Sequence, residues 1–444
     1  MGARARWAVL GLGVSLLALN LAAQQTRPRY GPAEYNDFTA ASSEQDPKLR
    51  VRNLDAFLEK YPDSALRPFV FQAYIQAYLA SDWPKVLEYA DKFLALDHAL
   101  VEEVYKHPGE SDEQAKERMT AVYYDIHFFR ARAFLLSPPD KGPQAGAAAE
   151  KAAASARQGL ELLEKLSRPP NLTPEKFVEL KKTGTGLFDA VLGNVAYRNK
   201  DYDTAARHFQ VVVDHNPNDA FYTERLALSY LQASKPQYLL GYWAWARAAA
   251  LFPESQKKNT RDKLVRSLTA YQAYAEACPR RHVEAQADEL IATAKTSVTP
   301  PAGWALPDAQ QVSALRSELP IKRIFDDLKA RSEQRQLVWV ASCGLELPEL
   351  TGDVLEVLDS GDNLVTLRLA VGEETTTTAN VEVKVKAPPE AKNIKPATTI
   401  RFSGVLTDYQ SDPFMLRLTE GKVNPEDIPK AETPAQRKKP RSSR

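Results

Sequence analysis

The residues that could act as acids, bases or metal ligands are scattered along this chain. Its six histidines are His98, His107, His127, His208, His215 and His282. No two of them have the His-Glu-x-x-His spacing, or any other spacing, that holds a zinc ion. We therefore predict no metal site and no cofactor. His208 lies inside a helical repeat, where we expect it to face solvent.

Candidate nucleophiles are equally isolated. The chain has no Gly-x-Ser-x-Gly elbow. Cys343-Gly344 follows an expected strand and has no evident histidine partner in its own domain. Thr183-Gly184-Thr185-Gly186 resembles a phosphate loop, but it lacks the following Gly-Lys-Thr and the preceding strand. We predict that the protein is not an enzyme, and a hydrolase of unrecognised type is the least favoured alternative.

Charge and cysteine content restrict the possible functions further. The 444 residues include 58 basic and 57 acidic side chains, for a net charge of +1. This balance argues against a nucleic-acid protein that relies on a basic field over its whole surface. The two cysteines, Cys278 and Cys343, fall in different expected domains. We expect two independent buried thiols rather than a bridge between domains.

The first residues have the build of a secretory signal peptide. Arg4 and Arg6 precede a nearly continuous apolar run, and Leu21-Ala22-Ala23 offers a cleavage site. We expect residues 1–23 to be removed and the mature protein to be periplasmic or secreted. The alternative is an uncleaved anchor in the inner membrane, which would give the protein a membrane contact. The polar residues 24–46 are predicted to be a flexible leader.

Residues 47–296 have the spacing of helices nearly throughout, so we searched them for a repeat. The clearest unit spans Leu187 to Asn218, with motif positions at Leu192, Gly193, Tyr197, Ala205, Phe209 and Pro217. It resembles the tetratricopeptide motif of about 34 residues. A second unit follows in phase, with Leu226, Ala227, Tyr230, Gly241, Trp245, Ala248 and Pro253. We expect two further helices, about residues 260–277 and 281–295, to cap the repeats.

The resemblance implies a curved solenoid whose inner face is lined by the first helix of each unit. On this chain it assigns partner-binding roles to six residues: Asn194, Tyr197, Arg198, Phe221, Arg225 and Leu228. Asn194 and Arg225 partly match the pattern with which tetratricopeptide domains hold a peptide carboxylate. The matching lysine is absent. The alternative is that these six side chains only pack or face water.

The C-terminal region has a different pattern. Residues 297–334 read as a linker and one helix, about Asp308 to Ser332. Residues 335–425 alternate in hydrophobicity and predict five or six short strands, the first at Leu337–Val340. The segments Arg401–Leu406 and Asp412–Leu416 resemble the closing strands of an OB-like barrel. Similar domains occur in exported acidobacterial tetratricopeptide proteins. Residues 426–444 are predicted to be a disordered basic tail.

These observations predict a tetratricopeptide-like α-helical solenoid followed by a small all-β domain, an OB-like barrel. The expected function is a non-enzymatic interaction scaffold of the cell envelope. It would bind a peptide or protein in the concave face of its repeats. One alternative is an envelope assembly factor whose contact surface is the β domain. Another is an OB-like module for nucleic acid or polysaccharide, although the charge balance disfavours nucleic acid. No small-molecule substrate is evident.

Overall fold

The computed structural model describes residues 30–430 except 108, 139–142, 331–333, 360–363 and 373–377. The predicted signal peptide and most of the predicted basic tail lie outside the described residues. Contacts between Cα atoms divide the chain into two compact units. Unit 1 comprises residues 1–257 and 294–300, and unit 2 comprises residues 258–293 and 301–444. Within the described ranges, every helix is too short or too polar to cross a bilayer.

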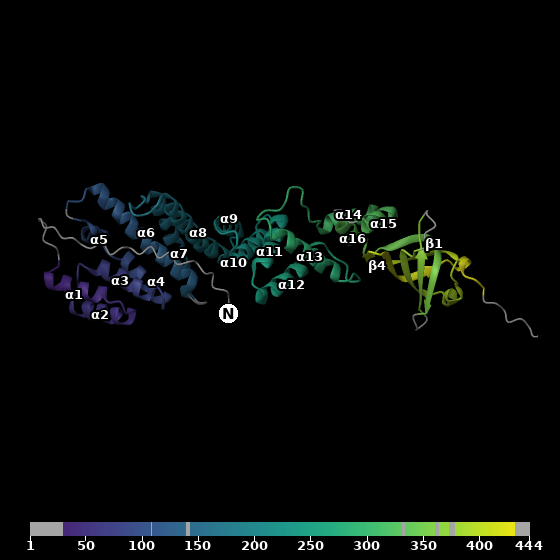
Figure 1. Ribbon diagram of the computed structural model, residues 1–444, viewed down its shortest axis with the longest axis horizontal. Helices are drawn as coiled ribbons and strands as arrows, with labels where there is room; N and C mark the ends of the chain where they lie inside the picture. Colours follow the sequence, from purple (N-terminus) through teal and green to yellow (C-terminus); the bar gives the residue numbers. More distant parts are fainter. Residues whose placement is uncertain are drawn as a thin grey trace, which may run out of the picture. The chain divides into compact units, whose positions relative to one another are not determined.

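Unit 1 is helical, as the sequence predicts, and most of its helices pack as consecutive pairs (Figure 1). The pairs are α1 with α2, α3 with α4, α6 with α7, α8 with α9, and α10 with α11. We call α3, α6, α8 and α10 the first helices of their pairs. The bounds are α1 (Pro32–Ser43), α2 (Pro47–Lys60), α3 (Arg67–Tyr78), α4 (Trp83–Leu94), α5 (His98–Tyr105), α6 (Asp112–Leu136), α7 (Pro143–Lys165), α8 (Pro174–Arg198), α9 (Tyr202–His215), α10 (Ala220–Gln232) and α11 (Tyr238–Leu251).

Aspartates cap the starts of the two neighbouring helices α9 and α10. The side chain of Asp201 accepts a hydrogen bond from the Thr204 amide at 3.1 Å, where α9 begins. Asp219 does the same for the Tyr222 amide at 3.0 Å, where α10 begins. Each carboxylate satisfies an N–H group that a helix start leaves without a partner. The caps therefore set where α9 and α10 begin.

Close contact between α8 and α9 depends on a glycine of α8, which has no side chain. A Cβ atom placed on Gly193 would lie 2.6 Å from Cε1 of Phe209, whose side chain is fully buried. Ala205, on the facing helix, is also fully buried. The small residues allow the two helix axes to approach, as ridge-into-groove packing requires.

Gly193→Ala is therefore expected to destabilise unit 1 by about 1–2 kcal/mol, because overpacking outweighs the better helix propensity of alanine. The matched control is Gly146→Ala in α7, where a new Cβ meets nothing within 4 Å. That change should stabilise the protein by up to about 1 kcal/mol. Denaturant unfolding of both variants tests the opposite signs. Equal effects would show that the α8–α9 crossing tolerates a side chain.

Part of the predicted flexible leader is ordered, which corrects that expectation. Residues 32–43 form α1, in which Phe38 and Ala41 are buried. The Phe38 ring packs against Phe57 at 5.9 Å and against Phe69 at 6.2 Å. The mostly polar sequence does not predict this helix, because only one of its faces packs against neighbouring helices.

Unit 2 contains helices and a barrel. Its helical part comprises α12 (Glu254–Tyr271) from Lys258 onward, α13 (Arg281–Ala294) up to Thr293, α14 (Ala309–Glu318), α15 (Ile321–Lys329) and α16 (Arg335–Ser342). Two helices that we expected to cap the repeats, α12 and α13, therefore lie mainly in unit 2. The single helix expected over 308–332 is two helices, because Pro320 caps the start of α15.

Five strands close into a barrel in the order β1-β2-β3-β5-β4. They are β1 (Glu346–Asp359), β2 (Val365–Ala370), β3 (Val381–Ala387), β4 (Thr399–Ser411) and β5 (Phe414–Val423), with short 3₁₀ turns at Pro389–Asn393 and Pro425–Asp427. Strands β3 and β5 are parallel, and every other pair is antiparallel. Leu367, Val383 and Leu416 point into a core with at most 1% of their surface exposed. The small β domain is thereby confirmed as a barrel.

The first expected strand is wrong. Residues 337–340 belong to α16, a helix of eight residues. Val338, Trp339 and Val340 are all buried, with at most 1% of their surface exposed. A short apolar run that is buried on all sides has no period that distinguishes a helix from a strand.

Candidate functional site

The residues that the sequence assigns to partner binding lie on the first helices α8 and α10. Arg225 of α10 places its guanidinium carbon 4.6 Å from the ring centre of Tyr197 on α8. The same carbon lies 5.2 Å from the ring of Phe221, one turn earlier on α10. The structure therefore brings three of the six predicted residues together. We call all six the α8–α10 surface.

The rings beside Arg225 are anchored to different degrees. Tyr197 is half-buried and meets Tyr202 edge-on, with ring centres 5.3 Å apart. Phe221 is 39% exposed, which is unusual for a large apolar side chain. The guanidinium is thus held against one half-buried ring and one exposed ring. A cation over aromatic faces at these distances is attracted by the ring electrons.

Arg225 forms no ion pair with any residue in the described ranges, whereas Arg130 and Arg118 of the same unit are each paired with a carboxylate. Among the described residues, its guanidinium is held against the two rings. An arginine held in this way can still offer its N–H groups to an arriving carboxylate.

The other three predicted residues do not contact the guanidinium cluster. Asn194 donates its side-chain amide to the Ala190 carbonyl of its own helix at 2.7 Å. Arg198 is exposed and Leu228 is half-buried. The Asn194 amide is thus already engaged within unit 1.

A narrow cleft lies nearby in unit 1, beside a buried arginine. Its volume is about 30 Å³, which suits water molecules rather than a ligand. Arg247 on its wall is 5% exposed and donates to the Pro217 carbonyl at 2.9 Å and the Ala294 carbonyl at 3.0 Å. Trp243 donates to the Ser297 carbonyl at 3.2 Å. These bonds fasten the extended segment 294–300 to α11, which is a structural role.

Two histidines in unit 1 each pair with a polar side chain of a neighbouring helix. His127 Nδ1 lies 2.7 Å from Ser155 Oγ, and both residues are 4% exposed. Burial lowers the pKa of His127 to about 4. His208, which we expected to face solvent, instead bonds the buried carboxylate of Asp189 at 2.7 Å. The first pair joins α6 to α7, and the second joins α8 to α9.

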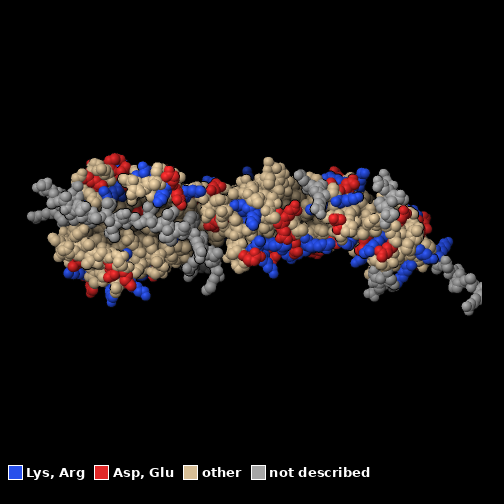
Figure 2. Space-filling view, in the orientation of Figure 1, with Lys and Arg blue, Asp and Glu red and all other residues tan. Residues whose placement is uncertain are grey.

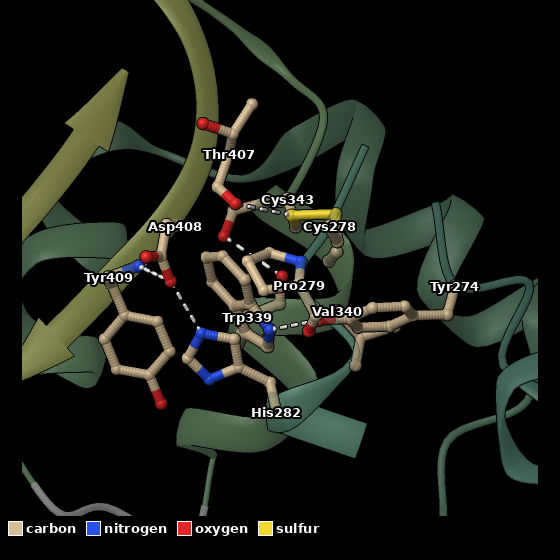
Figure 3. The surroundings of a disulfide bond; sticks show 12 residues. Tyr274, Cys278, Pro279, His282, Trp339, Val340, Cys343, Thr407, Asp408 and Tyr409 are labelled. Atoms are coloured by element: carbon tan, nitrogen blue, oxygen red, sulfur yellow. Dashed lines mark hydrogen bonds and ion pairs between the residues drawn. A yellow bond between two sulfur atoms is a disulfide. The ribbon is translucent and has the colours of Figure 1, made fainter. Parts of the chain in front are cut away.

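Unit 2 has a centre that the sequence analysis missed (Figure 3). Cys278 and Cys343 form a disulfide, with Cα atoms 6.1 Å apart. This corrects the expectation of two independent thiols. Cys278 follows α12 and Cys343 ends α16, so the bridge joins two helical segments of one compact unit. The two residues were expected to lie in different domains because the boundary was placed between them.

Three rings and a carboxylate surround the disulfide. His282 stacks on Tyr409 with ring centres 4.8 Å apart and lies 4.5 Å from Trp339. Its Nε2 is 2.9 Å from Asp408 Oδ1. Trp339 is fully buried and donates its indole N–H to the Tyr274 hydroxyl at 2.9 Å. The rings fill the space between α13, α16 and β4.

Asp408 is the common acceptor of this centre. It accepts hydrogen bonds from Arg281, from His282 and, at 3.3 Å, from Arg417. Burial opposes its ionisation, but the bonds from Arg281 and His282 hold the pKa of Asp408 below its usual value. Burial lowers the pKa of His282, and Asp408 acts in the opposite direction. His282 and Asp408 are both mostly buried, with 14% and 15% of their side-chain surface exposed.

No group of three or more His, Cys, Asp or Glu side chains in the described ranges is placed to hold a metal ion. A scan of protein-family models finds no match to the chain. A search of curated proteins finds no match either.

Proposed function

We propose that the protein is a non-enzymatic interaction scaffold that binds a peptide or protein carboxylate on the α8–α10 surface. The observation that carries the proposal is Arg225, a cation held between Tyr197 and Phe221 without an ion pair to any described residue. The paired helices of unit 1 support a tetratricopeptide-like arrangement, in which the first helices form the binding face.

Carboxylate recognition follows from how Arg225 is held. Its two flanking rings restrict the side chain before a partner arrives, so less rotamer entropy is lost on binding. A guanidinium can donate two parallel N–H bonds to one carboxylate. Phe221, which is 39% exposed, offers apolar area for a neighbouring side chain of the partner. A chain terminus or an acidic side chain beside an apolar residue would meet these requirements.

The test uses the full-length protein and an array of peptides synthesised in pairs, with a free or an amidated C-terminus. We expect a subset to bind only with the free carboxylate. Arg225→Ala should weaken binding of that subset about tenfold, the effect of losing one charge-assisted contact of about 1.4 kcal/mol. Fluorescence anisotropy of labelled peptides measures the change.

Arg207→Ala is the matched control, because Arg207 is an exposed arginine on α9 that bonds only Thr204 among the described residues. It should leave the affinities unchanged. If amidation never alters binding, or if both arginine variants weaken it equally, the carboxylate proposal is wrong.

The barrel is the alternative contact surface. Its five strands, with β3 parallel to β5, support an OB-like barrel. Ion pairs cross its outer surface in strand order, through Glu356, Arg368, Glu382, Arg417 and Asp408. Figure 2 shows acidic and basic side chains interspersed on its visible face. Because these arginines are already paired, the barrel favours a protein contact over single-stranded nucleic acid, which needs free cations and stacking rings.

We further propose that the protein works outside the cytoplasm. The Cys278–Cys343 disulfide supports this location, since such bonds persist in oxidising compartments. Fractionation of the native cells, with N-terminal sequencing of the recovered protein, tests both export and cleavage near residue 23. A protein recovered from the cytoplasm with both thiols free would contradict the proposal.

A further inference from the structure

Unit 1 holds a second arginine over an aromatic ring, outside the α8–α10 surface. Arg132 of α6 places its guanidinium carbon 5.1 Å from the ring centre of Trp83. Trp83 is the first residue of α4, directly after the turn that joins α3 to α4, and it packs partly buried against the neighbouring hydrophobic core. Arg225 and Tyr197 are arranged in the same way. In both cases an arginine of a first helix lies against a ring of the preceding helix pair.

Arg132 differs from Arg130 of the same helix in its polar contacts. Arg130 bonds the Asp91 carboxylate at 2.6 Å and the Lys151 carbonyl at 3.0 Å. The Nε atom of Arg132 is shielded from solvent and makes no hydrogen bond, and its guanidinium forms no ion pair within the described ranges. Burial lowers the pKa of Arg132, and no described acid opposes that effect. Buried donors are nearly always satisfied in folded proteins, so an unsatisfied one calls for a ligand or a water molecule.

The contacts of Arg130 indicate the side of α6 from which Arg132 extends. Both of its partners, Asp91 and Lys151, belong to second helices of their pairs, α4 and α7. Successive residues of an α-helix are rotated by about 100° around its axis, so Arg132 is rotated by about 200° from Arg130. Arg132 therefore extends from the opposite side of α6. The side chain as a whole is half-buried, so its outer N–H groups can reach an arriving carboxylate.

We propose that Arg132 is a second carboxylate site, and that unit 1 binds an extended acidic peptide between Arg225 and Arg132. The inference rests on the proposed function, because the carboxylate at Arg225 is one end of that peptide. Helix α6 packs against α8, and α8 meets α10 through Tyr197 and Arg225. Adjacent helix axes lie about 8–10 Å apart, so about 20 Å separate α6 from α10. An extended chain covers about 3.3 Å per residue, which places the second acidic side chain about six residues before the C-terminus.

A peptide array on the full-length protein tests the spacing. Each peptide carries glutamate or glutamine at one position from the third to the ninth before the C-terminus, and is made with a free and with an amidated end. We expect wild type to prefer glutamate about tenfold near the sixth position, the effect of one charge-assisted contact. Arg132→Gln should abolish this preference and leave the affinity for the glutamine peptides unchanged, which also shows that the variant is folded. Arg157→Gln, at an exposed position of α7, should behave as wild type.

The outcomes separate this inference from the proposed function. Binding that needs the free C-terminus but shows no preference for glutamate would overturn the site at Arg132 and leave the site at Arg225. A preference for glutamate that Arg132→Gln leaves unchanged would have the same meaning. A preference that depends on Arg132 but not on the free C-terminus would support the site at Arg132 and overturn the proposed function.

A second measurement uses only wild-type protein, so it remains valid if Arg132→Gln fails to fold. A photoreactive residue is placed beside the glutamate of a binding peptide, or beside its C-terminus, and the cross-linked segments are identified by mass spectrometry. We expect the first probe to cross-link near Trp83 and Arg132, and the second to cross-link near Phe221. Cross-links of both probes to the same segment would contradict the extended path across α8.

Discussion

Replacing both Cys278 and Cys343 with serine lowers the free energy of unfolding of unit 2 by on the order of 4 kcal/mol. The bridge spans 65 residues of sequence, and closing a loop of that size restricts the unfolded chain by about this amount. The loss falls on unit 2 because both sulfur atoms belong to it. Unfolding is measured by denaturant titration. Hydrogen exchange at each denaturant concentration shows which unit unfolds in each transition.

Two controls test whether the loss of stability comes from the disulfide and is confined to unit 2. Adding a reductant to the wild-type protein should reproduce most of the loss. Exchange protection in α8–α11 should be the same in wild type and the double serine variant. A variant whose barrel resists denaturant as well as wild type would show that the rings around Trp339, rather than the disulfide, hold the helices and barrel together.

Asp408→Ala is the second large change, and we expect it to destabilise unit 2 by about 3 kcal/mol. Removing one partner of a buried ionic group leaves the others without compensation, at a cost of about 3–5 kcal/mol. The low end applies here because Asp408 is 15% exposed and Arg281 is 56% exposed, so water screens part of the charge. Thermal unfolding measures the effect, together with hydrogen exchange of the backbone amides of α13 and β4.

Glu346→Ala is the control, since its ion pair with Lys422 is more than half exposed on both sides. It should change stability by less than about 1 kcal/mol. The pH dependence gives a further test. The lowered pKa of Asp408 means that its contribution is present above about pH 4 and is lost as the pH falls further. Wild type and Asp408→Asn should therefore converge in strongly acidic buffer. A difference that persists there would point to packing rather than charge.

The sequence predicts the helices and strands of this chain better than it predicts the side-chain clusters that distant segments form together. Helical spacing is repeated over many turns in unit 1, and each of the five strands contains a segment of alternating residues. The same method fails for residues 337–340, where four apolar residues fit either period. It also fails for α1, which buries only Phe38 and Ala41.

The candidate sites also differ in how well the sequence predicts them. Tyr197, Phe221 and Arg225 were found because a repeat with a fixed period places them on one surface. Asp408 and His282 are 126 residues apart, and no short motif connects them. The Cys278–Cys343 pair was missed for a related reason, since placing a domain boundary at residue 335 separated α13 from the strand it contacts. A boundary argued from composition cannot detect contacts between distant segments.

The order of the strands has a consequence for how the chain is made. Each helix pair of unit 1 joins neighbours in sequence, so it can fold soon after it leaves the ribosome. In unit 2, β1 cannot complete its pairing until β4 has been synthesised, because Leu350 of β1 pairs with Phe402 of β4. Until then β1 presents an unpaired edge that another chain can bind. We therefore expect products of interrupted translation that end before residue 399 to aggregate through β1, while their helical part is already folded.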